Sequence, residues 1–264
     1  MSRLPEAVEA FPRCAELRLP ADWRQVAFIS DLHLSEDLPR TTAAFERLLE
    51  TVQADALFIL GDLFEYWVGD DMLALPFEAR CAQALRVATR RLPIHVLRGN
   101  RDFLLGERFF AETGCRDLPD PTVLRAAWGD SLLVTHGDAL CIADTAYQQF
   151  RAQVRQPAWQ AALLARPLEE RVALARQMRA ASRDGGRAPE SYADADAQLC
   201  SQWLAAAGAP LMIHGHTHRP GRDSLPGGAV REVLCDWELD QAQPRADMLF
   251  WSAEGVRRES LIPL

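Results

Sequence analysis

The sequence contains no lysine, since all 29 basic residues are arginine. This absence excludes a Schiff-base lysine and a phosphate-loop lysine as the reacting group. A membrane-spanning run is also missing: the longest nearly apolar stretch, 203–213, is too short for a bilayer and is interrupted by Gly208 and Pro210. The first residues, which include Glu6 and Glu9, lack the apolar core of a secretory signal. The missing membrane-spanning run and the missing secretory core predict a soluble, cytoplasmic protein.

Paired cysteines and positive charge are scarce as well. The six cysteines never form a Cys-x-x-Cys motif, which indicates reduced thiols that are mostly packed in the interior. The formal net charge is −8 and the sequence pI is about 5.3. Generic nucleic-acid binding needs a positive field that displaces counterions from phosphates, so we expect no nucleic-acid partner.

The chain length and its apolar runs predict an α/β fold. The 264 residues fit one domain, 1–264, better than two independent cores. Helical spacing between the first apolar runs, as in Phe45, Leu48 and Leu49, predicts a mostly parallel sheet covered by helices. Five runs predict the main strands: 26–29, 56–60, 94–97, 132–134 and 211–213. Four later runs indicate a second sheet with two hairpins: 123–128, 231–235, 248–251 and 256–261.

The segment 144–207 interrupts this alternation with a helical pattern, which Pro157, Pro167 and Pro189 divide. We interpret the segment as a helical insertion within the domain. Between 151 and 187 it carries eight arginines and three acidic residues, hence a net charge of +5. Two interpretations stay open: a solvated helical face, or a lid that meets an anionic substrate or membrane. The apolar inner faces are expected at Phe150, Val154, Trp159, Leu163, Leu164, Leu168, Val172 and Met178.

Side chains that bind divalent metals follow each of the five main strands. They are Asp31, His33, Asp62, Asn100, His136, His216 and His218. Because the carboxyl ends of parallel strands line one crevice, and residues i and i+2 of an extended chain point the same way, these side chains are expected to converge. A mixed Asp, Asn and His set suits manganese, iron, zinc or nickel. Seven ligands suit two ions about 3.5–4 Å apart, with Asp62 as the bridging carboxylate.

Each of these short motifs is weak when taken alone. A single Gly-Asp or Gly-Asn pair is usually a turn, and a single histidine is usually structural. The combination is informative because five of the six histidines lie in these runs, each of which follows a predicted strand. His95 and His214 lie inside predicted strands, so packing or support of the ligands is expected for them.

The order of these motifs resembles the calcineurin-like metallophosphoesterase superfamily. The resemblance runs from Asp31 to His218 and implies a four-layer α/β/β/α sandwich with a helical lid insertion. It implies that the first ion is held by Asp31, His33, Asp62 and His218. It implies that the second ion is held by Asp62, Asn100, His136 and His216.

A narrower resemblance rests on Arg101, which stands where most of the superfamily has histidine. With the stretches 60–71, 101–106 and 214–220, it is similar to the family of UDP-2,3-diacylglucosamine hydrolases. That resemblance implies cleavage of UDP-2,3-diacylglucosamine to UMP and 2,3-diacylglucosamine 1-phosphate in lipid A synthesis, by a hydroxide that two Mn²⁺ ions per subunit activate. It further implies peripheral association with the cytoplasmic face of the inner membrane, an acylated UDP-sugar lipid as substrate and no obligate protein partner.

The same resemblance implies roles for individual residues. The catalytic set is Asp62, Asn100, Arg101 and His216. The substrate-binding set is Asn100, Arg101, Asp144, Ser182, Gly186 and His216. The stretch 183–189 departs from the family pattern because it lacks the usual asparagine and lysine, and Gly186 stands at the asparagine position.

Two alternatives belong to other functional classes. One is a different dinuclear-metal phosphodiesterase or phosphatase, against which Arg101 and the long insertion argue. The other is a non-catalytic binding module on the same fold. Such modules have usually lost ligands, whereas all seven ligand residues are present here.

Overall fold

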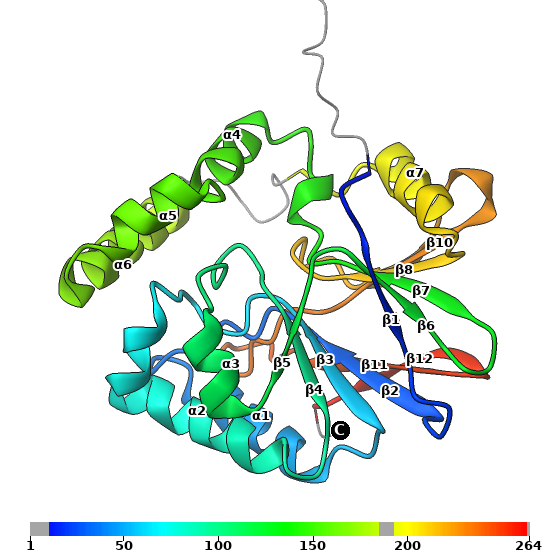
Figure 1. The fold of residues 1–264 in the computed structure, drawn as a ribbon, viewed down its shortest axis with the longest axis horizontal. Coiled ribbons are helices and arrows are strands. Elements are labelled where there is room, and N and C mark those ends of the chain that lie inside the picture. The colour runs from blue at the N-terminus through cyan, green and yellow to red at the C-terminus, as the bar shows by residue number, and fades with distance from the viewer. Residues whose placement is uncertain (1–10, 185–192, 263–264) are drawn as a thin grey trace, which may run out of the picture.

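The computed structural model of the chain describes residues 11–184 and 193–262, apart from the side chains of 181–184. Two six-stranded mixed sheets pack face to face, and helices cover both outer faces (Figure 1). This arrangement confirms the expected four-layer sandwich with a helical insertion.

Sheet A has the strand order β1-β6-β7-β8-β10-β9. Its strands are β1 (Ala15–Arg18), β6 (Thr122–Arg125), β7 (Ser131–Val134), β8 (Leu211–His214), β9 (Gly221–Ser224) and β10 (Val230–Val233). Sheet B has the order β12-β11-β2-β3-β4-β5. Its strands are β2 (Gln25–Ile29), β3 (Ala56–Leu60), β4 (Ile94–Leu97), β5 (Arg116–Leu118), β11 (Asp247–Ser252) and β12 (Gly255–Ser260).

The described helices divide into three groups. On sheet B lie α1 (Pro39–Thr51), α2 (Pro76–Ala88) and α3 (Glu107–Thr113). The insertion contains α4 (Thr145–Val154), α5 (Pro157–Leu164) and α6 (Leu168–Asp184), and α7 (Ala197–Ala207) follows. Short 3₁₀ turns are η1 (Asp70–Ala74), η2 (Asp138–Leu140) and η4 (Pro226–Gly228). Proline opens α1, α2 and α5, where its fixed φ suits the first helical position and its missing N–H costs no bond.

The five main strands and both hairpins are confirmed, but the four later runs do not form one second sheet, because β6 and β10 lie in sheet A and β11 and β12 in sheet B. β6 pairs with β7, and β11 pairs with β12, each antiparallel. The prediction missed β1, β5 and β9. β5 is only three residues long, and β9 is a polar, largely exposed strand at a sheet edge, so neither has an apolar alternation that a sequence pattern detects.

Alternation along β2 shows how the layers are built. Val26 and Phe28 point into the core between the two sheets, whereas Ala27 and Ile29 point to the core beneath α1 and α2. Both faces of the strand are therefore buried, as expected for a central strand of a covered parallel sheet.

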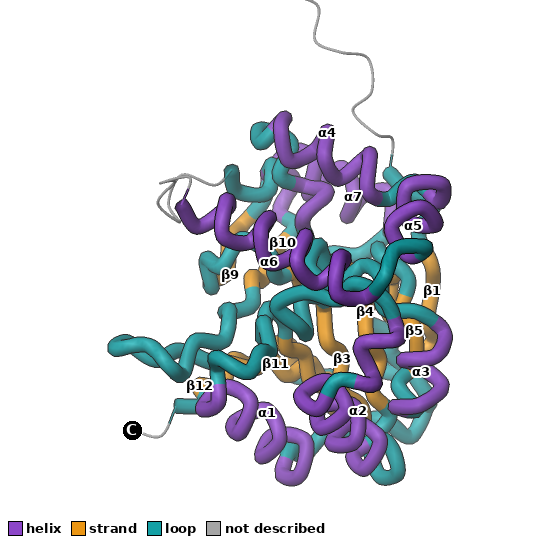
Figure 2. The backbone as a smooth tube through the Cα atoms, turned by 90° about the vertical axis from the view of Figure 1, so that its left-hand side faces the viewer, coloured by secondary structure: helices purple, strands orange, loops and turns teal. Residues whose placement is uncertain are grey.

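The expected insertion, 144–207, has two parts that differ in packing. In α7, Trp203 and Leu204 pack with Leu133 and Met212 on the outer face of sheet A, so this helix forms the fourth layer. Figures 1 and 2 show α4, α5 and α6 grouped together, away from α1 and α2.

The prediction of inner apolar faces is correct for some positions and wrong for others. Val154 and Leu163 are buried, and Trp159 packs against the core of sheet B. Leu164 and Met178 are instead 44% and 40% exposed. Leu168 and Val172 also pack on that core, while Phe150 is half-buried.

A buried arginine attaches the insertion to the sandwich. Arg171 of α6 is only 4% exposed, donates to the backbone carbonyls of Val68 and Arg166, and forms a two-pronged ion pair with Asp71. Gly69 has φ +137° and leaves room for this guanidinium, since a Cβ there would collide with it. The guanidinium thus fixes α6 on the loop that follows β3.

The different packing of α7 and α5 predicts different costs for the same substitution. Leu204→Ala in α7 should lower the free energy of unfolding by about 3 kcal/mol, because a buried leucine is lost and a cavity remains. Leu164→Ala in α5 should change it by less than about 0.5 kcal/mol. Urea denaturation followed by circular dichroism measures both, and equal costs would contradict the assignment of α7 to the sandwich.

Candidate metal centre

The loops after five strands bring all seven predicted ligand residues together. Asp31 and His33 follow β2, Asp62 follows β3, Asn100 follows β4, His136 follows β7, and His216 and His218 follow β8. A continuous series of short contacts between nitrogen and oxygen atoms connects them. Side chains almost two hundred positions apart in the sequence therefore meet at one end of the two sheets.

One half of the centre contains Asp31, His33 and His218. The Nε2 atom of His218 lies 3.3 Å from Asp31 Oδ1 and 3.3 Å from the Nε2 atom of His33. Two imidazole nitrogens face each other at hydrogen-bond distance beside a carboxylate. Such a group of lone pairs is the arrangement that a shared cation would satisfy.

The other half is organised around Asn100. Its Oδ1 atom lies 2.9 Å from His136 Nε2 and 2.8 Å from His216 Nδ1. The Nδ1 atom of His136 donates to the carbonyl of Leu60 at 2.9 Å, which sets the tautomer and leaves Nε2 available as a ligand.

Asp62 lies between the two halves. Its Oδ1 atom is 3.7 Å from His136 Nε2, and its Oδ2 atom is 4.0 Å from His33 Nδ1. Each oxygen therefore faces a different half, as a bridging carboxylate requires. Asp31, Asp62 and His136 are almost fully buried.

The backbone around the centre is strained. Five of the seven residues have φ between +50° and +64°, a left-handed conformation that costs a residue with a Cβ roughly 1 kcal/mol or more. These residues are Asp31, His33, Asp62, His216 and His218. Strain that recurs at the ends of several strands indicates that function, rather than stability, determined these positions.

Two glycines give the carboxylates room. A Cβ at Gly99 would overlap Asp62 Oδ1, and a Cβ at Gly215 would overlap Asp31 Oδ2. The Gly-Asn and Gly-His pairs of the sequence are therefore needed because the backbone approaches a neighbouring carboxylate.

Comparison with known proteins adds to this geometry. The calcineurin-like phosphoesterase family matches residues 24–220. The chain belongs to this family.

Three similar proteins are each named UDP-2,3-diacylglucosamine hydrolase. The one from Ralstonia nicotianae is 48% identical over 240 residues, which cover 85% of this chain and 88% of that protein. The one from Chromobacterium violaceum is 48% identical over 80% of this chain and 90% of its own length. The one from Stenotrophomonas maltophilia is 44% identical over 88% of this chain and 98% of its own length. The narrower resemblance is thus confirmed.

The charges of this phosphoesterase site are strongly coupled. Burial opposes ionisation of Asp31, but a hydrogen bond and positive charge from His218 hold its pKa well below the usual value. Burial raises the pKa of Asp62 to about 7. Burial opposes protonation of His136, yet the charges of Asp62 and Asp31 raise its pKa to about 9. Burial and the charge of His136 lower the pKa of His216 to about 3, so this imidazole is neutral at pH 7.

Two further carboxylates support the ligand residues. Asp102 accepts hydrogen bonds from the backbone N–H groups of Gly99 and Leu63, both at 2.7 Å, and so joins two of the loops. Asp236, which sequence reasoning missed, lies 3.3 Å from the Nδ1 atom of His218 through its Oδ2 atom. Its position three residues after the end of β10 was the available signal, because the ligand residues also follow strands.

The insertion approaches the centre with arginines, which sequence reasoning did not assign individually. Arg151 and Tyr147 both donate to the buried carboxylate of Asp138, at 2.8 and 2.7 Å. Arg155 donates to the carbonyl of Gly99 at 3.0 Å. In α6, Arg179 donates to Glu65 at 2.9 Å. The excess of arginine in 151–187 was the signal, and much of this charge faces the sandwich rather than solvent.

The residues expected to bind substrate lie in different surroundings. Arg101 is beside Asp62, to which its backbone N–H donates at 2.8 Å. Asp144 is the N-cap of α4 and accepts from the N–H of Tyr147 at 3.1 Å. Ser182 lies in α6 but its side chain is not described, and Gly186 lies outside the described residues.

Other histidines and a separate pocket take no part in the centre. His95 stacks on Phe58 with ring centroids 4.7 Å apart, and the Nδ1 atom of His214 contacts the carbonyl of Gly215.

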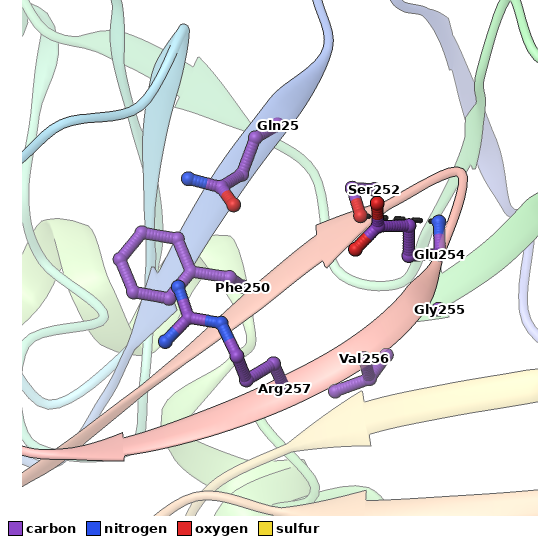
Figure 3. A pocket seen from close by; sticks show the side chains of 7 residues that line it. All are labelled: Gln25, Phe250, Ser252, Glu254, Gly255, Val256 and Arg257. Carbon is purple, nitrogen blue, oxygen red and sulfur yellow. Dashed lines mark hydrogen bonds between the residues drawn. The ribbon is translucent and has the colours of Figure 1, made fainter.

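A pocket of about 120 Å³ lies beside Gln25, at the opposite end of β2 from Asp31, where Arg257 covers the ring of Phe250 (Figure 3). It holds no cluster of ligand-type side chains.

The donor set fits divalent cations. Ligand atoms of Asp31, His33 and His218 lie within 4.8 Å of one another, and so do those of Asp31, Asp62 and His136. Among the described residues, the buried Nδ1 atom of His33 has no hydrogen-bond partner. Buried carboxylate oxygens and imidazole nitrogens that lie this close together form a donor set typical of sites for divalent metals.

Metal binding is expected to stabilise the folded protein. Mn²⁺ at about 100 times its dissociation constant adds about 2.7 kcal/mol, which corresponds to roughly 5 °C in Tm for a chain of this size. His136→Gln should remove much of this shift, whereas His95→Gln, at a buried histidine outside the centre, should retain it. Thermal unfolding with and without Mn²⁺ measures the shift. Equal shifts in both variants would argue against the centre.

Proposed function

We propose that this phosphoesterase hydrolyses the pyrophosphate bond of UDP-2,3-diacylglucosamine and releases UMP and 2,3-diacylglucosamine 1-phosphate. The supporting observation is the convergence of seven ligand-type side chains next to Arg101. The chain that carries them is 48% identical to two proteins named UDP-2,3-diacylglucosamine hydrolase. Water adds across the P–O–P linkage, so one P–O bond forms as another breaks. Lipid A synthesis is the process in which this substrate is consumed.

We assign the metal ligands in two sets that share Asp62. The first set is Asp31, His33, Asp62 and His218, and the second is Asp62, Asn100, His136 and His216. Two Mn²⁺ ions suit this mixture of oxygen and nitrogen donors. When bound, such ions hold phosphoryl oxygens, offset the charge of the transition state and make water a stronger nucleophile at neutral pH.

Arg101 is the group that we assign to phosphate binding. Its guanidinium lies 3.0 Å from Glu65 through Nη1 and 3.6 Å from Asp62 through Nε, so two carboxylates orient it. A planar guanidinium stays positively charged and can donate two parallel hydrogen bonds to phosphate oxygens. Arginine at position 101, where most of the superfamily has histidine, thus suits binding of a negatively charged phosphate rather than proton transfer.

His216 and Asn100 act by positioning in this account. Burial lowers the pKa of His216 to about 3, which disfavours the doubly protonated imidazolium that a general acid would need at pH 7. The departing sugar 1-phosphate needs no proton, since a phosphate with a second pKa near about 6 leaves as an anion. Asn100, which contacts both His136 and His216, keeps the two rings aligned.

The insertion supplies the rest of the substrate site. Asp144, Ser182 and Gly186 are assigned to the glucosamine head group on the basis of resemblance. On the same basis, we assign shelter of the acyl chains to the insertion, with each buried methylene contributing about 0.8 kcal/mol.

Substitution at the bridging position tests the proposed reaction. Asp62→Ala should reduce turnover of UDP-2,3-diacylglucosamine by more than about a hundredfold. Even loss of a residue that only supports a metal ligand typically lowers activity about 10–100-fold. Asp117→Ala, at an exposed residue paired with Arg98, should keep full activity. Release of UMP, followed by chromatography in the presence of Mn²⁺, is the measurement. Preference for bis(p-nitrophenyl) phosphate over the acylated substrate in the unmodified protein would favour the alternative phosphodiesterase.

We also propose peripheral association with the cytoplasmic face of the inner membrane, where the acylated substrate resides. In the described part of the chain, no helix is both long and apolar enough to cross a bilayer. Exposed apolar side chains support contact with the surface: Ile142, Leu164 and Met178 are 37%, 44% and 40% exposed, and all three lie in or beside the insertion.

Vesicle binding tests this association. The double variant Leu164→Asp/Met178→Asp should bind several-fold less to vesicles of phosphatidylglycerol and phosphatidylethanolamine, because charged side chains resist burial among lipid chains. Val87→Asp, at a 52% exposed position on α2, is the matched control and should bind like the unmodified protein. Co-sedimentation measures the bound fraction, and a result in which the control loses as much as the double variant would contradict contact through the insertion.

A further inference from the structure

Glu65 lies where the sandwich, the metal centre and the insertion meet. It belongs to the loop after β3, three positions beyond Asp62, and its side chain is 13% exposed. Glu65 lies in the stretch 60–71, which contributes to the family resemblance, but the sequence pattern assigned no role to it.

The two carboxylate oxygens of Glu65 contact different arginines. Oε2 accepts from Nη1 of Arg101 at 3.0 Å, and Oε1 accepts from Nε of Arg179 at 2.9 Å. Arg101 comes from the loop after β4, whereas Arg179 comes from α6. One carboxylate thus connects an arginine of the metal-ligand loops to an arginine of the insertion.

The electrostatics explain why a carboxylate is needed there. Arg101 and Arg179 are 16% and 22% exposed, so their mutual repulsion is only partly screened. Burial and the charge of Arg101 lower the pKa of Arg179, and the charge of Glu65 opposes that effect. Without Glu65, two long cationic side chains would separate and regain rotamer freedom in solvent.

Glu65 is too far from the metal centre to form a hydrogen bond with it. Its nearest contact there is 3.8 Å, between Oε2 and His33 Nδ1. The hydrogen bonds from Arg101 and Arg179 are shorter, and they indicate that Glu65 positions other groups.

We propose that Glu65 is a positioning residue that holds Arg101 at the metal centre and, through Arg179, holds α6 against the sandwich. This inference rests on the role assigned to Arg101 under the proposed function. It means that docking of the insertion and orientation of the phosphate-binding arginine depend on the same carboxylate.

A double-mutant cycle tests the first half of this proposal. Glu65→Gln should lower kcat for UDP-2,3-diacylglucosamine about 10–100-fold with little change in KM, as expected for loss of a supporting partner. The same change made in an Arg101→Gln protein should lower kcat by less than about threefold, because its target is already absent. Equal losses in both backgrounds would overturn the proposal.

The controls separate positioning from general damage. Glu46→Gln removes a two-pronged pair with Arg80, each bond 2.7 Å, on the surface of α1 and α2, and should leave kcat unchanged. Bound manganese and Tm of Glu65→Gln should match those of the unmodified protein, and loss of the metal would overturn the proposal.

Hydrogen exchange tests the second half without any assay of activity. Amides of α6 should exchange faster in Glu65→Gln and in Arg179→Met, and combining the two changes should add little. Unchanged exchange in α6 would overturn the docking role. If the unmodified protein fails to hydrolyse UDP-2,3-diacylglucosamine, the proposed function fails, whereas this exchange experiment still decides whether Glu65 docks α6.

Discussion

Buried negative charge at the ends of the strands is the constraint on which the rest of the structure depends. Asp31 and Asp62 are almost fully buried and have ligand atoms within 4.8 Å of each other and of His136. Removing carboxylates from water costs several kcal/mol each, and the left-handed backbone around them adds strain. Positive charge at the centre of the cluster would offset much of these costs, so the site is organised for cations.

Ion pairs between arginines and carboxylates also attach the insertion to the sandwich. Arg171 attaches α6 near β3, Arg151 attaches α4 to Asp138, and Arg179 meets Glu65. Each pair joins an insertion helix to a loop that carries or follows a ligand residue. The arginines of the insertion thereby connect it to the loops of the candidate metal centre.

The family resemblance implied the sandwich, and the strand pattern predicted the seven converging residues, because apolar strands end in ligand-type side chains and parallel strands bring such ends together. Asp236 escaped prediction because its contact with His218 arises only when β10 pairs with β8. Leu164 and Met178 were misplaced because helical spacing identifies an apolar stripe without showing how a short helix turns on its neighbours. The pair Arg171 and Asp71, a hundred positions apart, has no local pattern at all.

Diffraction from manganese-soaked crystals, recorded at the manganese absorption edge, tests the central claim most directly. The account predicts two anomalous peaks about 3.5–4 Å apart. One peak should lie among Asp31, His33 and His218, the other beside Asn100, His136 and His216, and Asp62 should contact both. A single peak, or peaks elsewhere on the protein, would contradict it.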